Sequence, residues 1–217
     1  NKTVTANFSL IGGGCSYYDI NDEDFESGWG IWNDGGSDCR KNIKDSDYAH
    51  SGDYCVRLRD NDPNSSFMTT DNLDLEIYEE LTVDFGYYVR SFDNSNEDFW
   101  LQISTNGGGT FTTVEDWVLG TDFENNEFKT GEAVIAGPFT ANTQLRFRCD
   151  ASGNSDWVYL DDVVITGCSL TPPTPIIGNS PSDYDLDIEN SAESREVVFE
   201  NSIQSEIPKL NLFPNPA

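Results

Sequence analysis

Hydrophobic side chains in this chain recur at every second position, and this spacing constrains the fold more than any other feature. Between residues 81 and 89 the apolar positions are Leu81, Val83, Phe85, Tyr87 and Val89. The same alternation occurs at 54–59, 99–104 and 145–150, whereas 158–165 is almost continuously apolar. A period of two places alternate side chains on opposite faces of a β-strand. Strands are therefore predicted in these segments, with 158–165 as a central strand.

Turn-forming residues separate the alternating runs, in segments such as NDGGSD, DNDPNSS, TNGGGT and ASGNSD. No helical stripe of apolar residues extends beyond about two turns. Short strands at regular spacing with Gly- and Asn-rich turns are typical of sandwiches and barrels. The pattern predicts an all-β protein, an antiparallel β-sandwich of jelly-roll type with an extended C-terminal tail.

The charge of the chain excludes one large class of partner. Its 217 residues include 39 Asp and Glu against 12 Lys and Arg, for a formal net charge of −27. Such a chain offers no basic surface for phosphate backbones, so nucleic acid is not an expected partner. No apolar run approaches the roughly 20 residues of a membrane-spanning helix, so no membrane insertion is expected.

Five cysteines, at positions 15, 39, 55, 149 and 168, indicate an oxidising compartment. Such a number is unusual in a reduced cytosolic protein, and the chain is expected to be secreted, extracellular or at the cell surface. A Cys15–Cys168 bridge would join the two ends of the patterned region. A Cys39–Cys55 bridge would close a loop of about 15 residues. The alternative is that some of the five are buried apolar residues with free thiols.

Composition divides the chain into four parts. Residues 1–14 are a short lead-in, and residues 15–168 carry the strand pattern. Residues 169–209 form a Pro-rich and then acidic linker, in which the segment 194–201, SREVVFEN, has the pattern of an additional strand for an exposed sheet edge. Residues 210–217 close the sequence and are interpreted below.

Three short motifs within residues 15–168 occur in an order that resembles known domains. Asp24-Phe25-Glu26 precedes Gly28-Trp29, the turn Ala49–Gly52 follows, and WVYLDDVVITGC closes the region at 157–168. This order resembles the MAM domain and the jelly-roll carbohydrate-binding modules attached to bacterial glycoside hydrolases. The five cysteines depart from the MAM pattern. The resemblance implies the fold and points to binding rather than to a particular ligand.

Two further segments resemble known motifs. Residues 104–111, STNGGGTF, resemble the Asp-box turn of sialidase-like repeats, with Asn106 in the acidic position. That motif is a hairpin-forming device in many proteins, so it predicts a turn and not a sialidase. Residues 210–217, LNLFPNPA, resemble the opening of the sorting domain that Bacteroidota use for type IX secretion.

Catalysis is not expected. A Ser-His-Asp or Cys-His arrangement would need His50, the only histidine, which lies in a Ser-Gly turn typical of a surface position. The sequence contains no phosphate-binding loop, dinucleotide fingerprint or HExxH motif. A pair of carboxylates is uninformative in a chain with 39 acidic residues.

The resemblance to jelly-roll binding modules implies a structural calcium ion where the first strand meets the last. Calcium prefers carboxylate and carbonyl oxygens. Adjacent aspartates on one strand point to opposite faces, so at least one of the pair at 161 and 162 should lie against the sheet and need a partner. The alternative is that these carboxylates accept hydrogen bonds from Arg or backbone amides. The implied ligand set is Glu26, Ser51, Gly52, Asp53 and Asp161 or Asp162.

Sugar sites combine flat aromatic faces with polar side chains that hold hydroxyl groups. Trp32, Trp100 and Trp117 flank predicted loops or strand ends and are candidate sugar-stacking residues. Trp100 shares its strand face with Gln102, which marks a polar face. Trp29 and Trp157 adjoin the motifs that close the sandwich and are expected in the core.

Two arginine pairs are candidates for ligand contacts. Arg57 and Arg59 share one strand face, as do Arg146 and Arg148. A guanidinium group matches a sulfate or carboxylate bidentately, which favours an anionic polysaccharide. The alternative is that these arginines neutralise neighbouring acidic residues within the sheet.

Together these features favour a non-catalytic, calcium-stabilised carbohydrate-binding module of a secreted multi-domain bacterial protein. Its expected partners are a polysaccharide or cell-surface glycan and the attached domains of the same polypeptide. The alternative is a MAM-like adhesion or protein-interaction domain at the cell surface. Convergence of Trp100, Gln102, Arg57 and Arg59 on one solvent-facing concave face would favour the first interpretation, and scattered or buried positions the second.

Overall fold

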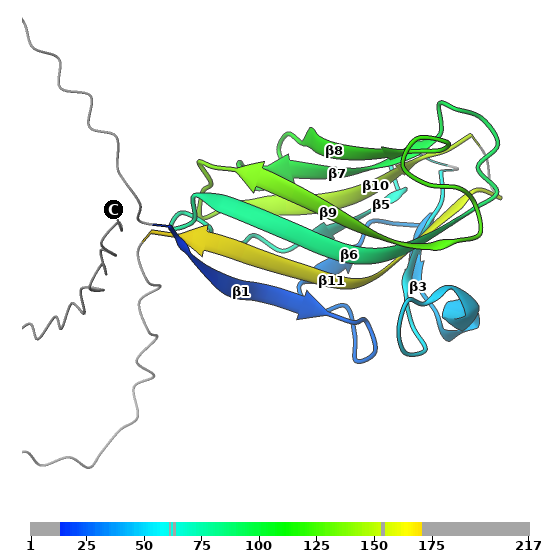
Figure 1. Ribbon diagram of the computed structural model, residues 1–217, viewed down its shortest axis with the longest axis horizontal. Helices are drawn as coiled ribbons and strands as arrows, with labels where there is room; N and C mark the ends of the chain where they lie inside the picture. The colour runs from blue at the N-terminus through cyan, green and yellow to red at the C-terminus, as the bar shows by residue number, and fades with distance from the viewer. Residues whose placement is uncertain (1–13, 61, 63, 153–154, 171–217) are drawn as a thin grey trace, which may run out of the picture. The chain divides into compact units, whose positions relative to one another are not determined.

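The computed structural model describes residues 14–170 except 61, 63 and 153–154, and only the backbone of Ile43 and Lys44. The chain forms two antiparallel β-sheets packed face to face (Figure 1). The predicted all-β sandwich is confirmed. The predictions for the lead-in before Gly14, the linker beyond Leu170, the strand at 194–201 and the sorting segment at 210–217 lie outside the described residues.

Within the described part of the chain, one sheet contains six strands in the order β3-β4-β11-β6-β9, with β1 paired to β11. We call it the β11 sheet. β11 is its central strand, because β6 pairs along one edge while β4 and β1 share the other edge. The bounds are β1 Ser16–Glu23, β3 Cys39–Lys41, β4 Val56–Leu58, β6 Glu80–Arg90, β9 Phe128–Ala136 and β11 Trp157–Ser169.

The second sheet of the described region, here the β10 sheet, has five strands in the order β2-β5-β10-β7-β8. β10 is its middle strand and pairs with β5 on one side and β7 on the other. The bounds are β2 Trp32–Asp34, β5 Phe67–Thr70, β7 Asp98–Ser104, β8 Thr112–Val118 and β10 Gln144–Asp150.

The core lies between the sheets and is built from the alternating residues that the sequence marked as apolar. In β6 every predicted inward side chain is buried, and in β10 the same holds for Leu145, Phe147 and Cys149. Phe85 lies at the centre, with its ring 4.9 Å from that of Trp117 and 4.7 Å from that of Phe147. Edge-to-face contacts of this kind favour aromatic packing.

The cysteines follow the prediction in part. Cys15 and Cys168 form a disulfide that joins the start of β1 to the end of β11, as expected for a clamp at the ends of the domain. The second expected bridge, between Cys39 and Cys55, is wrong, because both are separate buried thiols, as is Cys149. Burial raises the pKa of Cys39 to about 12, so this thiol is un-ionised at neutral pH.

The Asp-box-like segment forms the β7–β8 connection, and the turn prediction is confirmed. Asn106 Oδ1 accepts hydrogen bonds from Ser104 Oγ at 2.8 Å and from the Thr110 amide at 2.9 Å. The Gly108 amide donates to Ser104 Oγ at 3.0 Å, with Gly108 in the positive-φ region that favours glycine. Asn106 therefore organises the turn through its side-chain hydrogen bonds.

Helical structure in the described residues is limited to one 3₁₀ helix, η1, Ile43–Tyr48, which follows β3 (Figure 1). None of the described segments is a helix with the length and apolar character that crossing a membrane requires.

Candidate functional site

The outer surface of the β10 sheet collects four of the predicted ligand-binding residues. Arg146 lies directly opposite Gln102, and Arg148 lies opposite Trp100. On the other side of β10, Arg148 is also opposite Phe67. Residues opposite one another in antiparallel strands point to the same face. We call this surface the β10 face, and its members are Phe67, Trp100, Gln102, Phe111, Arg146 and Arg148.

Arg146 is held in place by contacts on three sides. Its Nε and Nη2 atoms both donate to Gln102 Oε1, at 2.8 and 2.6 Å. The guanidinium group lies 3.8 Å from the Phe111 ring and 5.1 Å from the Phe67 ring. Gln102 is itself anchored by donating to Thr113 Oγ1 at 3.1 Å. Arg146 is therefore a pre-oriented cation, because its planar group is fixed before any ligand arrives.

Gln102 differs in one respect from its prediction as a solvent-facing residue. It is 5% exposed, because the Arg146 side chain covers it. Its role on the β10 face is to position Arg146 rather than to present its own amide to a ligand.

Arg148 and Trp100 form the second half of the β10 face. The Arg148 guanidinium lies 5.3 Å from the Trp100 ring centre, within the range of a cation–π interaction. Arg148 Nε is buried and has no hydrogen-bond partner. A buried donor without a partner is costly and marks a place where a ligand atom would gain a hydrogen bond.

Among the described residues neither arginine of the β10 face forms an ion pair, although Asp60 lies close enough for the charge of Arg148 to act against the burial that raises the pKa of Asp60. Across the described residues, the ion pairs involve Arg40, Arg57, Arg59, Lys129 and His50, but not Arg146 or Arg148. Burial, and then the charge of Arg148, lowers the pKa of Arg146 to about 10. Arg146 remains protonated at neutral pH, and two adjacent positive charges face outward from a strongly acidic protein.

Two tryptophans predicted to bind ligand are core residues instead. Trp32 is 1% exposed and packs on Phe147, with ring centres 5.7 Å apart. Trp117 is 7% exposed and stacks on Phe99 at 5.1 Å with an interplanar angle of 15°. Both occupy inward-facing positions of their strands, so neither indole is available to a ligand.

The other predicted arginine pair lies on the opposite sheet. Arg57 is on β4 in the β11 sheet, so Arg57 and Arg59 do not converge with Trp100 and Gln102. Arg57 Nη1 pairs with Asp45 Oδ1 at 3.2 Å, and Arg59 Nε pairs with Asp38 Oδ1 at 2.7 Å. The predicted convergence of the four residues on one face is therefore wrong. Arg57 and Arg59 instead fit the alternative, in which arginines form ion pairs with acidic neighbours.

Trp157 was expected in the core, and this prediction is also wrong. Its ring lies on the outer side of the β11 sheet beneath both arginines, 3.8 Å from the Arg57 guanidinium and 5.3 Å from that of Arg59.

Phe67 and Phe111 are two members of the β10 face that the sequence analysis did not identify. The segment FMTT has no alternation of apolar and polar residues that could have marked Phe67 as outward-facing, and the alternation appears only in the burial of β5.

The residues of the predicted calcium site meet around the turn at 50–54. Glu26 Oε1 accepts from the amides of Asp53 and Tyr54, at 2.8 and 2.7 Å. Gly52 has a φ of 60°, and a Cβ atom there would lie 2.3 Å from Glu26 Oε1, so glycine is required. Glu26 thus fixes one side of the turn by hydrogen bonds to its backbone.

Asp161 fixes the other side of the turn. Its Oδ2 accepts from the amides of His50 and Ser51, at 2.8 and 3.0 Å. Asp162 contacts the same turn, because its Oδ1 accepts from Ser51 Oγ at 2.7 Å. The expectation that these neighbours point to opposite faces is wrong: Asp162 has a φ of 48°, and the pairing with β6 shifts register after Asp161.

The hydrogen bonds of this turn do not form a cation cage. The oxygens of Glu26 and Asp161 accept N–H groups, which is the alternative that the sequence left open. Among the described residues, no three His, Cys, Asp or Glu side chains gather as they would to hold a metal ion. Calcium binding stays a prediction.

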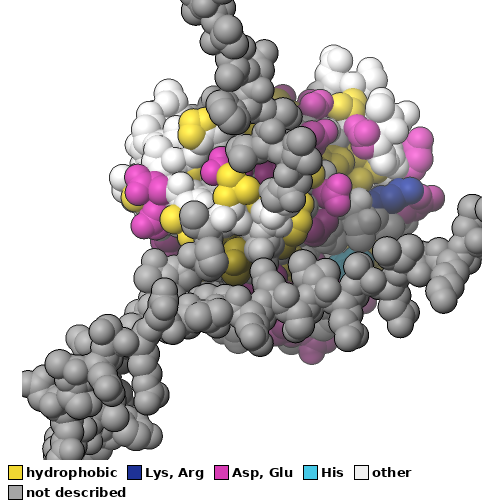
Figure 2. Space-filling model, turned by 60° about the vertical axis from the view of Figure 1, so that its left-hand side comes forward, with side chains coloured by type: hydrophobic (Ala, Val, Ile, Leu, Met, Phe, Trp, Pro, Cys, Tyr) yellow, Lys and Arg dark blue, Asp and Glu magenta, His cyan; other side chains and the backbone are white. Residues whose placement is uncertain are grey.

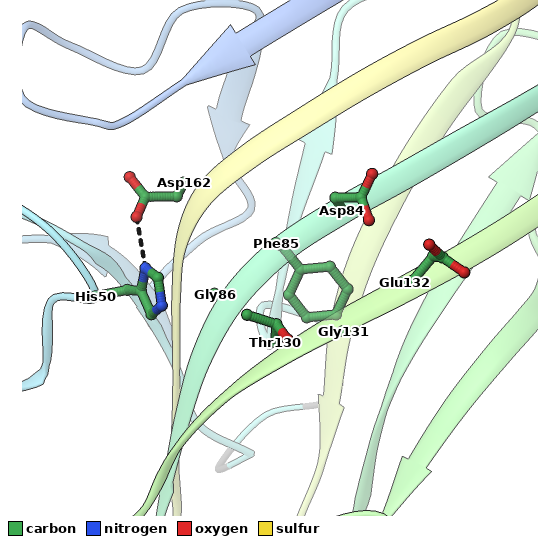
Figure 3. Close-up of a pocket in the computed structure, with 8 residues that line it drawn as sticks. All are labelled: His50, Asp84, Phe85, Gly86, Thr130, Gly131, Glu132 and Asp162. Atoms are coloured by element: carbon green, nitrogen blue, oxygen red, sulfur yellow. Dashed lines mark hydrogen bonds and ion pairs between the residues drawn. The ribbon is translucent and has the colours of Figure 1, made fainter.

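A cavity of about 390 Å³ opens on the outer side of the β11 sheet (Figure 3). Figure 3 shows the Asp84 and Glu132 carboxylates on one side and the His50–Asp162 pair on the other. Asp84 and Glu132 are directly opposite each other on β6 and β9. His50 lies over Gly86, where a Cβ atom would come within 2.5 Å of its ring. The lining therefore includes three carboxylates, from Asp84, Glu132 and Asp162.

His50, Ser51 and Asp162 do not have the contacts of a hydrolytic triad. In a triad the histidine lies between the serine and the carboxylate. Here Asp162 lies between them, since His50 Nδ1 is 2.6 Å from Oδ2 and Ser51 Oγ donates to Oδ1. The expectation of a non-catalytic protein stays a prediction.

In Figure 2 acidic side chains are scattered over the visible described surface, whereas Lys and Arg show in one small area. This distribution agrees with the formal net charge of −27. Among the described residues, Lys41 and Arg90 also form no ion pair, but Arg146 and Arg148 place two such charges side by side on one strand face.

No protein-family model matches the sequence, and the search of curated proteins finds no match. Solved structures do resemble the fold. The CBM22-1 xylan-binding domain of Paenibacillus barcinonensis Xyn10C has a TM-score of 0.53 and 10% identity, over 72% of this chain and 99% of that one.

Two further structures extend the comparison. The CBM22-1–GH10 modules of Clostridium thermocellum endo-1,4-β-D-xylanase 10B, complexed with xylohexaose, have a TM-score of 0.52 and 17% identity, over 69% of this chain but only 29% of that one. The K3 cleaved adhesin domain of Porphyromonas gingivalis Lys-gingipain has a TM-score of 0.46 and 18% identity, over 70% and 99%. The gingipain likeness is too distant to support an argument, and the two xylanase modules show the fold alone.

Proposed function

We propose that this protein is a non-catalytic carbohydrate-binding module that holds an anionic polysaccharide on its β10 face. Trp100 supplies an aromatic surface for a sugar ring, and Arg146 and Arg148 contact its carboxylate or sulfate groups. The observation that carries the proposal is a pair of adjacent arginines that form no ion pair with any described residue, in a chain of net charge −27.

The chemistry of the β10 face favours an acidic sugar over a neutral one. A guanidinium group donates two parallel hydrogen bonds to a carboxylate or sulfate, which a hydroxyl cannot accept in the same way. Arg148 Nε is buried and lacks a partner that such an oxyanion would provide. The likeness to a xylan-binding domain is a likeness of fold and supports the general class of ligand rather than the sugar.

Affinity electrophoresis tests this function directly. The full chain is run through gels that contain a neutral xylan, a uronate-rich polysaccharide or a sulfated polysaccharide. We expect retardation by an anionic polymer, and about a tenfold loss of affinity in Trp100→Ala and in Arg148→Gln, since each removes a principal contact.

The matched control is Lys129→Gln, which removes one positive charge from the other sheet, where Lys129 pairs with Glu127. It should leave retardation unchanged. Equal weakening by Lys129→Gln and Arg148→Gln would show that only the net charge matters. Failure of every polymer to retard the wild-type chain would contradict the proposed function.

Calcium is tested in the same gels and by thermal unfolding, with added calcium or with a chelator. The proposal of a structural ion at the Glu26–Asp161 turn predicts a lower Tm in chelator. An unchanged Tm would mean that the backbone hydrogen bonds to Glu26 and Asp161 are sufficient.

The cellular setting follows from the disulfide and the fold class. The Cys15–Cys168 disulfide is of a kind that forms and persists in oxidising compartments, and it supports our proposal of a secreted or cell-surface location. A binding module of this kind acts by holding attached domains of the same polypeptide near the polysaccharide.

The second candidate is a MAM-like adhesion or protein-interaction domain. Two observations favour it: Arg57 and Arg59 lie on the sheet opposite Trp100, and Phe128 and Val134 of β9 are 48% and 58% exposed. It would be supported by the absence of retardation in every gel together with self-association or partner binding that is lost in Val134→Ser.

A further inference from the structure

The outer side of the β11 sheet contains a second arginine cluster, and it surrounds a cavity. Arg40, Arg57 and Arg59 line a space of about 50 Å³ together with Ser37, Asp38 and Trp157. Arg40 and Arg57 come from the neighbouring strands β3 and β4 and are directly opposite each other in register. Like charges in that position repel unless a negative charge lies between them.

The carboxylates nearby compensate these charges only in part. Asp45 Oδ1 pairs with Arg57 Nη1 at 3.2 Å, but Arg40 Nε is 3.9 Å from Asp45 Oδ2, which is too long for a hydrogen bond. Asp38 lines the cavity, but its oxygens already accept from Arg59 Nε and from the Asp62 amide. Three guanidinium groups therefore share two carboxylates, and Arg57 has the Tyr159 hydroxyl as a further partner.

Arg57 provides separate evidence that a hydrogen-bond acceptor is missing at this cavity. Its side chain is 11% exposed, and its Nε atom is buried without a hydrogen-bond acceptor. The Trp157 ring lies 3.8 Å from the guanidinium group and fixes its plane. Ser37 adds a hydroxyl to the lining. The cavity thus has a rigid floor and one buried N–H donor, Arg57 Nε, that lacks an acceptor.

We propose that this cavity is a binding subsite for a small oxyanion of the sulfate type, held by Arg40, Arg57 and Arg59. Its volume of about 50 Å³ exceeds the roughly 10–15 Å³ that one water molecule needs but is far too small for a sugar ring. It accepts one oxyanion group, either the free ion or a sulfate ester that projects from a larger ligand. The subsite is on the sheet opposite the β10 face and does not depend on the function proposed for that face.

The test is a titration of the full chain with sodium sulfate at an ionic strength held constant with sodium chloride. The readout is the NMR signal of the Trp157 indole N–H, assigned by comparison with Trp157→Phe. We expect a saturable shift, and a tenfold or greater loss of affinity in Arg40→Gln and in Arg59→Gln. Arg40 is 47% exposed at its side chain, so Arg40→Gln should fold normally, and its Tm verifies this.

Arg148→Gln is the matched control, since it removes the same charge from the β10 face and should leave the Trp157 titration unchanged. A response no larger than that to chloride, or one unaffected by Arg40→Gln, would overturn the proposal. So would a response lost only in Arg148→Gln, which would place the anion on the β10 face.

The source of the oxyanion is identified by two further ligands. Glucose 6-sulfate that binds more tightly than inorganic sulfate would assign the subsite to a sulfated glycan. Glucose 6-sulfate that binds more weakly than inorganic sulfate would assign it to the free ion. Glucose itself should give no shift.

Discussion

At the scale of single residues, Asp161 is a buried carboxylate in an acidic chain. It is 1% exposed, and it accepts backbone N–H groups from the turn at His50 and Ser51. Burial raises the pKa of Asp161 to about 6, and the nearby Asp162 adds to this, while the hydrogen bond from the Ser51 amide acts in the opposite direction. The ionised form is therefore less favourable in the folded state than in the unfolded chain.

This pKa predicts how stability changes with pH. Between the unfolded value of 3.8 and the folded value of about 6, the native state binds more protons than the unfolded state. The stabilising contribution of Asp161 to the free energy of unfolding is thus fully present below about pH 4. It is lost as the pH rises through about 6. Urea unfolding of wild type and Asp161→Asn at several pH values measures it. The stability of wild type relative to the variant should fall over this interval, by at most about 3 kcal/mol.

Subtracting the variant removes the pH dependence of the remaining groups to the extent that they act independently of position 161. A relative stability that stays constant, or that increases with pH, would contradict the assignment of this pKa to Asp161.

At the scale of elements, β11 connects the parts of the β11 sheet. It pairs with β6 over most of its length and with β4 and β1 on its other edge. The Cys15–Cys168 disulfide holds β1 to the end of this central strand across a sequence separation of 153 residues. A long closed loop restricts the unfolded chain strongly in the chain-entropy model.

Removal of this bridge should therefore lower the free energy of unfolding by roughly 2–5 kcal/mol. The variant is the double substitution Cys15→Ser with Cys168→Ser, measured by urea unfolding. A reductant should destabilise wild type to the same extent and leave the double variant unchanged. Destabilisation of the double variant by reductant would reveal a second disulfide among Cys39, Cys55 and Cys149.

The sequence predicted where the strands lie, but it did not predict which sheet each strand joins or which side chains face solvent. Period-two patterns predicted β6, β7, β10 and the central strand β11, because alternation is a local property. It could not show that Arg57 and Arg146 lie on different sheets, since strand order depends on pairing between distant segments. Trp32 and Trp117 were misplaced because their short segments flank turns, where the inward direction is set by pairing with β5 and β7.

The calcium-site residues illustrate a second limit of sequence reasoning. Their convergence on one turn was predicted from a resemblance, and the structure brings them together. The register shift after Asp161 and the positive φ of Asp162 have no clear signal in the sequence, because Asp is tolerated in both strand and left-handed conformations. That local irregularity places both aspartates against the turn.

At the scale of the whole molecule, the net charge of −27 and an anionic ligand act against each other. The acidic surface repels a polyanion over distances comparable to the Debye length, about 10 Å at 0.1 M salt. Arg146 and Arg148 attract it only at short range. Added salt weakens both effects, but it screens the long-range repulsion between exposed charges more than the partly buried contacts of the arginine pair.

Retardation by an anionic polysaccharide should therefore be weakest at very low ionic strength, rise as salt is added to about 0.1 M, and fall again at high salt. A neutral polysaccharide has no such repulsion to screen and should show little dependence on salt. Affinity gels run over this range of ionic strength make the comparison, with Arg148→Gln as the variant that lacks the short-range attraction. That variant should bind the anionic polymer more weakly than wild type at every salt concentration. A steady decrease in wild-type affinity from the lowest salt upward would mean that a larger basic surface binds the polymer. The site would then extend beyond the two arginines of the β10 face.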